Sequence, residues 1–142
     1  MSATLEVLAA LPRSGVAVRS LHFLALAVLL GGSATIALLD RPSPTLARRY
    51  EYAFWIGIGI IVATGVGNVG MLAPAVPDLE TTWGRTFAVK VIAVIGLLLF
   101  SMIRTGRIGD GAGDALPDRR WYALTAGWVA VIAVLAVVMA RG

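Results

Sequence analysis

The residues of this chain with the greatest chemical potential lie inside strongly apolar stretches. His22 is the only histidine, and it stands in the segment VAVRSLHFLALAVLLGG with Arg19 three residues before it. Lys90 and Asn68 interrupt two other apolar segments in the same way. Ionisable groups at the centre of a membrane span cost roughly 2.5–3.5 kcal/mol, and they usually face the interior of a helix bundle. We therefore take these four residues as candidates for a functional site.

The depths of these residues predict that they form one layer. At 1.5 Å per residue, His22, Lys90 and Asn68 lie about 7–9 Å from the outer edge of their respective predicted spans. Arg19 lies one helical turn above His22, and we expect both to face the same interior, with Arg85 at the rim. A purely structural role would also explain why each of these residues is present. Lys90 would extend to the lipid headgroups, Asn68 would join helices, and His22 would bond a backbone carbonyl.

A site of this kind would hold copper or haem. A neutral imidazole is a good ligand for either metal, and copper(I) also favours thioethers. Met71 and Met139 end near the same surface and would serve copper, unless they only fill gaps in the packing. A b-type haem would take His22 as its axial ligand, with cations near its carboxylates. The cations available for this are Arg19, Arg85 and Lys90.

The elements that position these residues are predicted to be membrane spans. The chain is 58% hydrophobic and only 14% charged, whereas soluble domains are about 25% charged. A span needs roughly 20 mostly apolar residues, and four windows qualify, at about 16–39, 53–73, 86–103 and 122–139. We predict an all-α membrane protein that forms a single domain over residues 1–142, a bundle of four transmembrane helices. Residues 2–11 predict a short helix lying on the outer surface, or a partly apolar tail.

Two sequence patterns bear on how the helices are arranged. LARRYEYAFW at 46–55 resembles LPDRRWYALTAGW at 116–128, and RSLHFLALAVLLGG at 19–32 resembles RTFAVKVIAVIGLL at 85–98. These likenesses indicate two repeated helical hairpins, or else the narrow residue usage of membrane proteins. In the second span, small residues at i, i+4 spacing predict close helix packing, which would place this span at the centre of the bundle. They are Gly59, Ala63 and Gly67.

Several function classes are excluded. The chain has no cysteine, which rules out disulfides, cysteine-ligated metal and thiol catalysis. GVGNVG at 65–70 matches a dinucleotide-binding pattern, but it lies within a span and follows no strand. GDGAGD at 109–114 lacks the ligand spacing of a calcium loop. The basic residues stand at the ends of spans, where they anchor to lipid headgroups, so nucleic acid is not an expected partner.

The distribution of these basic residues predicts an orientation. With four spans, the 40–52 and 104–120 loops share one side and carry seven of the 12 basic residues, whereas the opposite side carries five. Cytoplasmic loops are enriched in Lys and Arg, so both termini are predicted to be extracytoplasmic. The N-terminal residues MSATLEVLAALPRSG lack the features of a cleaved signal peptide.

Three sequence blocks resemble the copper-resistance D (CopD) membrane domain. The first is Arg19-x-x-His22 followed by Gly31-Gly32, the second is the stretch 48–65, and the third is TTWGRTFAVKVIAVIGLLLFSMIRT, which ends near Arg104. The likeness covers about residues 14–107. It implies an inner-membrane helical bundle linked to copper uptake or tolerance, with His22 as the ligand and a periplasmic copper-binding protein as a partner. The chain is about the size of one bare CopD domain.

A second family is also similar, namely the HemJ-like four-helix protoporphyrinogen oxidases. In that family a first-helix histidine and a third-helix lysine are implicated in haem binding, and His22 and Lys90 match them in kind. The aromatic and arginine signature that follows the first helix of that family is absent here. The functional alternatives are therefore a CopD-like copper- or haem-binding protein, a haem-dependent oxidoreductase, and an accessory subunit of a larger membrane complex, for example one that transfers electrons.

Overall fold

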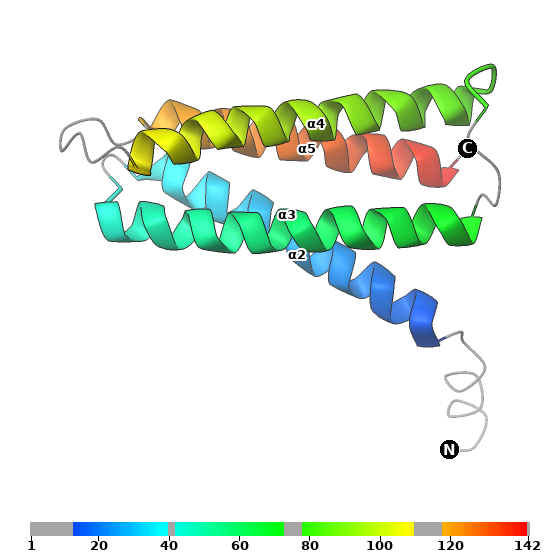
Figure 1. The fold of residues 1–142 in the computed structure, drawn as a ribbon, viewed down its shortest axis with the longest axis horizontal. Coiled ribbons are helices and arrows are strands. Elements are labelled where there is room, and N and C mark those ends of the chain that lie inside the picture. The colour runs from blue at the N-terminus through cyan, green and yellow to red at the C-terminus, as the bar shows by residue number, and fades with distance from the viewer. Residues whose placement is uncertain (1–12, 40–41, 73–77, 110–117, 142) are drawn as a thin grey trace.

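A computed structural model describes residues 13–39, 42–72, 78–109 and 118–141. Within these ranges all regular structure is helical, in α2 (Arg13–Leu38), α3 (Pro44–Leu72), α4 (Thr82–Gly109) and α5 (Arg119–Arg141). Successive helices run in opposite directions (Figure 1). We call the end where α2 begins and α5 finishes the termini end. The other end, where α2 leads into α3 and α4 leads towards α5, is called the loop end.

The observed helices extend beyond the predicted spans because polar residues continue and cap them. The second helix begins at Pro44, not near residue 53. Ser43 precedes it, and its hydroxyl accepts a hydrogen bond from the Leu46 amide at 3.2 Å, while proline is well suited to the first helical position. In the same way, the Thr81 hydroxyl accepts the Gly84 amide at 3.0 Å at the start of α4. An apolar window measures membrane thickness, not helix length.

Each helix turns one stripe of side chains inward, and the stripes of α2, α3 and α4 share a pattern. On α4 the stripe runs from Lys90 through Val94 and Leu97 to Ser101 and Arg104, with the three- and four-residue spacing of one helical face. Reading from the termini end, the stripes of α2 and α3 likewise run from polar through apolar to polar. On α2 the inward side chains are His22, Ala25, Leu29 and Ser33. On α3 they are Thr64, Ile61, Ile58 and Glu51.

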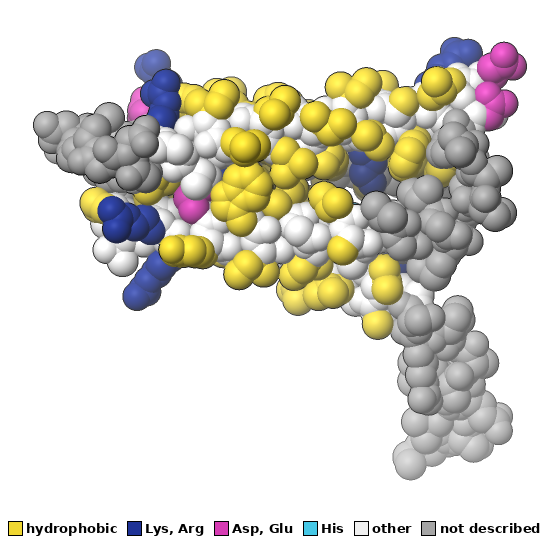
Figure 2. Space-filling model, in the orientation of Figure 1, with side chains coloured by type: hydrophobic (Ala, Val, Ile, Leu, Met, Phe, Trp, Pro, Cys, Tyr) yellow, Lys and Arg dark blue, Asp and Glu magenta, His cyan; other side chains and the backbone are white. Residues whose placement is uncertain are grey.

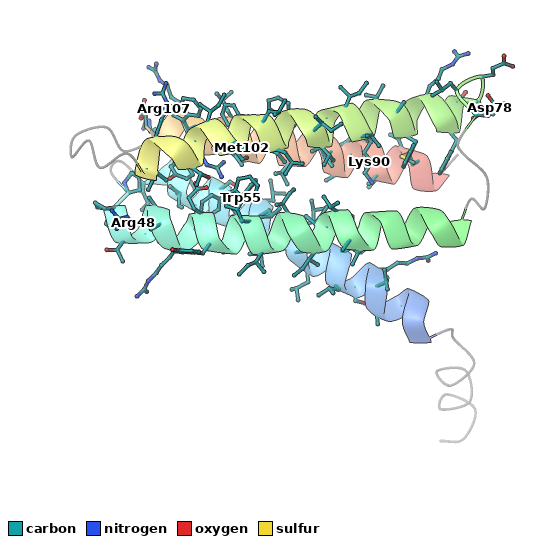
Figure 3. The ribbon with its side chains drawn as sticks, in the orientation of Figure 1. Arg48, Trp55, Asp78, Lys90, Met102 and Arg107 are labelled. Atoms are coloured by element: carbon teal, nitrogen blue, oxygen red, sulfur yellow. The ribbon has the colours of Figure 1, made fainter. Side chains whose placement is uncertain are left out.

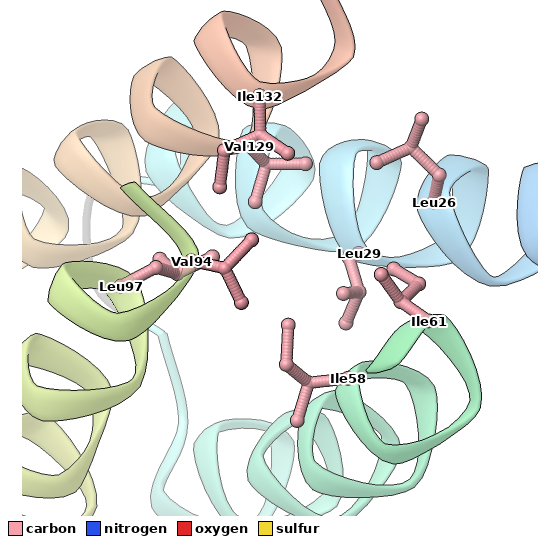
Figure 4. Close-up of a pocket in the computed structure, with 8 residues that line it drawn as sticks. All are labelled: Leu26, Leu29, Ile58, Ile61, Val94, Leu97, Val129 and Ile132. Carbon is pink, nitrogen blue, oxygen red and sulfur yellow. The ribbon is translucent and has the colours of Figure 1, made fainter. Parts of the chain in front are cut away.

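The middle of the bundle is an apolar layer to which all four helices contribute. Its side chains surround a cavity of about 10 Å³ (Figure 4). The lining residues are Leu26, Leu29, Ile58, Ile61, Val94, Leu97, Val129 and Ile132. A space of this size holds at most one water molecule, and a wholly apolar lining offers that molecule no hydrogen bonds. This layer therefore separates the polar residues at the two ends with a dry barrier.

The helices do not pack equally against one another. α2 packs extensively against α3 and α5, and α4 packs against α5, whereas α3 and α4 touch little. α2 also diverges from the bundle towards its own N-terminus (Figure 1). The bundle is therefore closed along three of its helix pairs. We call the fourth, weakly packed boundary the α3–α4 seam.

The small residues on α3 do not act as predicted. Gly59 and Ala63 are exposed, and a side chain added at Gly59 would meet nothing within 4 Å. The prediction that this stripe packs α3 into the centre of the bundle is therefore wrong, and Gly67 lies where the structure does not describe side chains. Close approach on the α2–α3 interface occurs instead at Gly57, where a Cβ would lie 3.0 Å from Leu29. α2, not α3, is the central helix.

The outer surface is suited to a lipid environment. Large apolar side chains cover the outward faces of the helices, as the space-filling view shows (Figure 2). Three helical stretches, Gly15–Leu38, Thr82–Ile108 and Arg119–Met139, are long and apolar enough to cross a membrane. The chain is therefore a membrane protein whose regular structure, over the described residues, is all helical. The fourth span and the hairpin repeat remain predictions, and the predicted surface helix at 2–11 lies outside the described residues.

Replacing a packed glycine and replacing an exposed glycine by alanine should have opposite effects on stability. A Cβ at Gly96 would lie 2.6 Å from the Trp128 ring, whose Nε1–H donates to the Ala93 carbonyl at 2.9 Å and so holds the ring in place. Gly96→Ala should lower the free energy of unfolding by about 1–3 kcal/mol through overpacking. Gly59→Ala should raise it by up to about 1 kcal/mol, because alanine favours the helix. Denaturation in mild detergent measures both, and equal effects would contradict the packing described here.

Candidate functional site

His22 is held at the termini end by a hydrogen bond between α2 and α3. Its Nδ1 lies 2.7 Å from the Thr64 hydroxyl, and that hydroxyl donates its own proton to the Ile60 carbonyl at 2.6 Å. With its proton on the Ile60 carbonyl, the Thr64 hydroxyl accepts from the Nδ1–H tautomer of His22, in which Nε2 carries the lone pair that can bind a metal. The Ile61 backbone also forms a hydrogen bond with the ring.

Lys90 is the charged group that faces His22. It lies on the inward stripe of α4, is half-buried, and is close enough to interact electrostatically with the imidazole. Figure 3 shows Lys90 extending from α4 towards α3, well inside the ends of the bundle. Among the described residues, no side chain forms a hydrogen bond or an ion pair with its ammonium group. The termini end thus brings together an imidazole and a positive charge that has no counter-ion among the described side chains.

The two predicted arginines do not join this pair. Arg19 is exposed on the part of α2 that diverges from the bundle, so the prediction that it shares an interior face with His22 is wrong. Arg85 is also exposed, and its guanidinium donates to the backbone carbonyls of Leu79 and Glu80 at 3.0 and 3.3 Å. Its side chain caps the turn before α4, and its predicted role at the rim of a site stays a prediction.

The remaining predicted ligands are less well placed or lie outside the description. Asn68 and Met71 belong to the last turns of α3, where the structure does not describe side chains. Met139 is partly buried near the end of α5. Within the described residues, no group of three or more histidine, cysteine or acidic side chains could hold a metal ion. Among the residues that the structure describes at this end, His22 is the candidate ligand.

The most extensive polar cluster lies at the loop end and was not predicted as a site. The Arg104 guanidinium of α4 is fully buried and binds the Glu51 carboxylate of α3 with two parallel hydrogen bonds. The Nε–Oε1 distance is 2.7 Å and the Nη2–Oε2 distance is 3.1 Å. Paired, planar bonds of this kind are the strongest form of side-chain ion pair. We expected Arg104 among the headgroup-anchoring cations of a loop, and that expectation is wrong.

Further contacts satisfy both charges of this pair. Arg104 Nη1 donates to the Thr125 hydroxyl of α5, and Glu51 accepts the Thr105 hydroxyl at 2.7 Å. Trp55 donates its indole N–H to the Thr105 hydroxyl at 3.0 Å. The guanidinium also lies over three aromatic rings at 4.5–5.6 Å from their centroids, those of Tyr50, Phe54 and Tyr122. A desolvated cation gains about 2 kcal/mol from such a contact.

One sequence signal would have revealed the cluster. Glu51 is an acidic residue at the polar margin of one predicted span, and Arg104 is a basic residue at the margin of another, and the predicted topology places both margins on the same side. Their spacing from the apolar layer is the same, since each lies seven residues beyond a cavity-lining residue, Ile58 and Leu97 respectively. Matching depths of opposite charges predict an ion pair, but depth by itself does not say that both face inward.

Comparison with known proteins adds no assignment. Neither protein-family models, nor curated proteins, nor solved structures yield a match to this chain.

The ion pair predicts that substitutions of Glu51 and Arg104 have non-additive effects on the free energy of unfolding. Arg104→Gln leaves a buried, unpaired carboxylate and should cost about 3–5 kcal/mol of the free energy of unfolding, as should Glu51→Gln. The double variant, which removes both charges, should cost clearly less than the sum of the two. Arg120→Gln is the control, because Arg120 forms only an exposed 3.7 Å pair with Asp118 and should change stability by about 1 kcal/mol or less. Additive effects of Glu51 and Arg104 would contradict the described geometry.

Proposed function

We propose that this chain is a CopD-like membrane protein that binds a b-type haem at the termini end through Nε2 of His22. The proposal is carried by the hydrogen bond from His22 Nδ1 to Thr64. Metal-binding histidines almost always donate their second ring N–H to an oxygen, because this sets the tautomer and orients the ring. Thr64 supplies that oxygen from the neighbouring helix, and its own hydroxyl proton is engaged at Ile60.

The charge beside His22 favours haem over a copper ion. A bare copper ion would bring more positive charge next to the unpaired ammonium of Lys90, whereas haem carries carboxylates that would compensate it. Copper would also need further soft ligands, and within the described part of the chain only Met139 lies towards this end. Copper handling is therefore the second reading, tested by the same experiment.

The protein's own residues would hold and tune such a cofactor. His22 would be the single histidine ligand, Thr64 would fix the plane of its ring, and Lys90 would face the carboxylates. Bound haem supplies one-electron or oxygen chemistry whose course depends on the axial ligand and the polarity around it. The dry layer between the two ends would keep water and protons of the loop end away from the site.

We infer an orientation from the exposed basic residues. The loop end carries Arg48 and Arg107 (Figure 3), together with Arg49, Arg119 and Arg120, all of them exposed. The positive-inside rule then places the loop end in the cytoplasm. In this orientation His22 and both termini lie on the extracytoplasmic side of a bacterial-type inner membrane.

The cofactor assignment predicts a visible spectrum that depends on His22. The protein purified in mild detergent should show a Soret band, and His22→Ala should abolish it while the helical content is retained. Thr64→Val should weaken haem binding by about 10–100-fold, because the ring loses its orienting acceptor. Thr35→Val is the matched control, since the Thr35 hydroxyl is exposed and bonds only the Gly31 carbonyl of its own helix.

Metal analysis of the same samples decides between the alternatives. Copper without a Soret band, lost in His22→Ala, would overturn haem and favour the copper reading. A Soret band of full intensity in His22→Ala would overturn the ligand assignment. Protein free of both haem and metal would leave the accessory-subunit role.

A further inference from the structure

We infer that the loop-end cluster binds internal water, held by the hydroxyl groups of Tyr122 and Ser101. The loop-end cluster is the buried pair of Glu51 and Arg104 together with the polar side chains packed around it. This water site does not depend on the proposed haem. It follows from the burial of the two hydroxyls, the hydrogen bonds of their neighbours and the charge of the cluster.

Tyr122 and Ser101 carry buried hydroxyl groups that have no partner in the described part of the chain. Both side chains are fully enclosed, with 0% of each residue exposed. Neither the Tyr122 hydroxyl nor the Ser101 Oγ forms a hydrogen bond with another described residue. A desolvated hydroxyl without a partner is costly, and buried polar groups in proteins generally bond either the protein or ordered water. The two groups therefore indicate a ligand that completes them.

Both hydroxyls belong to the region of the ion pair. The centroid of the Tyr122 ring of α5 lies 5.6 Å from the guanidinium carbon of Arg104, and the ring packs edge-on against Tyr50 at 5.4 Å. Ser101 of α4 precedes Arg104 by one helical turn on the inward stripe of that helix. Tyr122 similarly precedes Thr125, which accepts a hydrogen bond from Arg104. Each hydroxyl is thus one turn from a residue of the ion-pair network.

The neighbouring polar groups already have partners. The Tyr50 hydroxyl bonds Ser33, and Ser33 donates its own proton to the Leu29 carbonyl at 2.5 Å. Both oxygens of Glu51 accept hydrogen bonds from Arg104, at 2.7 and 3.1 Å. These bonds engage the polar groups around the two hydroxyls, so we expect the missing partner to come from outside the chain.

The charge of the cluster favours a neutral ligand. Glu51 and Arg104 neutralise each other, so a bound anion or cation would leave a net charge in a fully buried site, which is costly. A guanidinium has five N–H donors, and the bonds of Arg104 to Glu51 and Thr125 engage three of them. The site is therefore rich in donors, and its ligand has to accept hydrogen bonds as well as donate them.

Water has all of these properties. It is neutral, it both donates and accepts, and it is small, as a ligand of two enclosed side chains has to be. Internal water typically forms about three hydrogen bonds with buried groups that lack another partner. The apolar layer in the middle of the bundle offers water no hydrogen bond. We therefore expect the water on the loop-end side of that layer.

A crystal structure of the full chain, at a resolution that shows ordered solvent, tests this inference directly. Solvent peaks should lie about 2.7–3.0 Å from the Tyr122 hydroxyl and from the Ser101 Oγ. Crystals soaked in bromide should show no anomalous signal at these positions. Hydroxyls that bond protein groups with no solvent beside them would overturn the inference. A bromide signal there would also overturn it, because the ligand would then be an anion.

Unfolding in mild detergent tests the Tyr122 hydroxyl in solution. Tyr122→Phe should lower the midpoint of thermal unfolding, because a satisfied hydrogen bond is lost. If the hydroxyl had no partner, the same change would raise the midpoint, because a costly buried polar group would be removed. Tyr50→Phe is the matched control, since its hydroxyl bonds Ser33, and it should lower the midpoint to a similar extent. A raised midpoint for Tyr122→Phe would contradict bound water.

The Ser101 hydroxyl is tested in the same way. Ser101→Ala should lower the midpoint, whereas Ser20→Ala, which removes an exposed hydroxyl from α2, should not. A midpoint for Ser101→Ala that is equal to or above that of the wild type would contradict bound water at Ser101.

His22→Ala separates this inference from the proposed function. His22 lies on the other side of the dry layer, so this variant should keep both solvent peaks although it loses haem under the proposed function. Loss of the peaks in a folded His22→Ala variant would overturn the water site. Absence of haem from the wild type would overturn only the proposed function.

Discussion

The buried pair of Glu51 and Arg104 is the constraint on which the arrangement of the four helices depends. Neither charge is tolerable alone in an apolar interior, and the free energy of a buried pair is favourable only when nearly all its hydrogen bonds are made. Here the hydroxyls of Thr105 and Thr125 supply further hydrogen bonds, and three aromatic rings pack against the guanidinium. Because those partners come from α3, α4 and α5, the pair sets the rotation of all three helices. It also accounts for the link between α3 and α4, which touch little elsewhere.

Once the ion pair fixes the rotation of the helices at the loop end, helix geometry fixes the depth of the polar residues at the other end. On α4, Lys90 and Arg104 are separated by 14 residues and share one face, so they lie about 20 Å apart. On α3, Thr64 and Glu51 stand at a similar separation. Each polar end is thus held at a matching depth on neighbouring helices, with the dry layer between them. The protein has two separate polar compartments, and no polar path joins them through the described residues.

The two compartments differ in how far their charges are satisfied. At the loop end opposite charges neutralise each other, as is typical of a structural ion pair. At the termini end the imidazole bonds the Thr64 hydroxyl and the Ile61 backbone, and the ammonium group of Lys90 lacks a counter-ion among the described side chains. Unsatisfied groups of this kind are costly for a fold, and they are expected where a ligand completes the structure. For this reason the proposed haem site lies at the termini end.

The sequence by itself determined that the chain is helical and belongs in a membrane, and it identified His22 and Lys90 as residues of interest. Hydrophobicity and segment length carry that information locally, since a span must satisfy its backbone within itself. The direction of each side chain was decided only by tertiary structure. Gly59 was predicted to face inward and faces out, Arg19 was placed beside His22 and is exposed, and Arg104 was placed in a loop and is buried. The depth of a residue in the membrane follows from its position along its own helix. The direction in which its side chain points depends on the residues of the other helices that pack against it, and those residues are distant in the sequence.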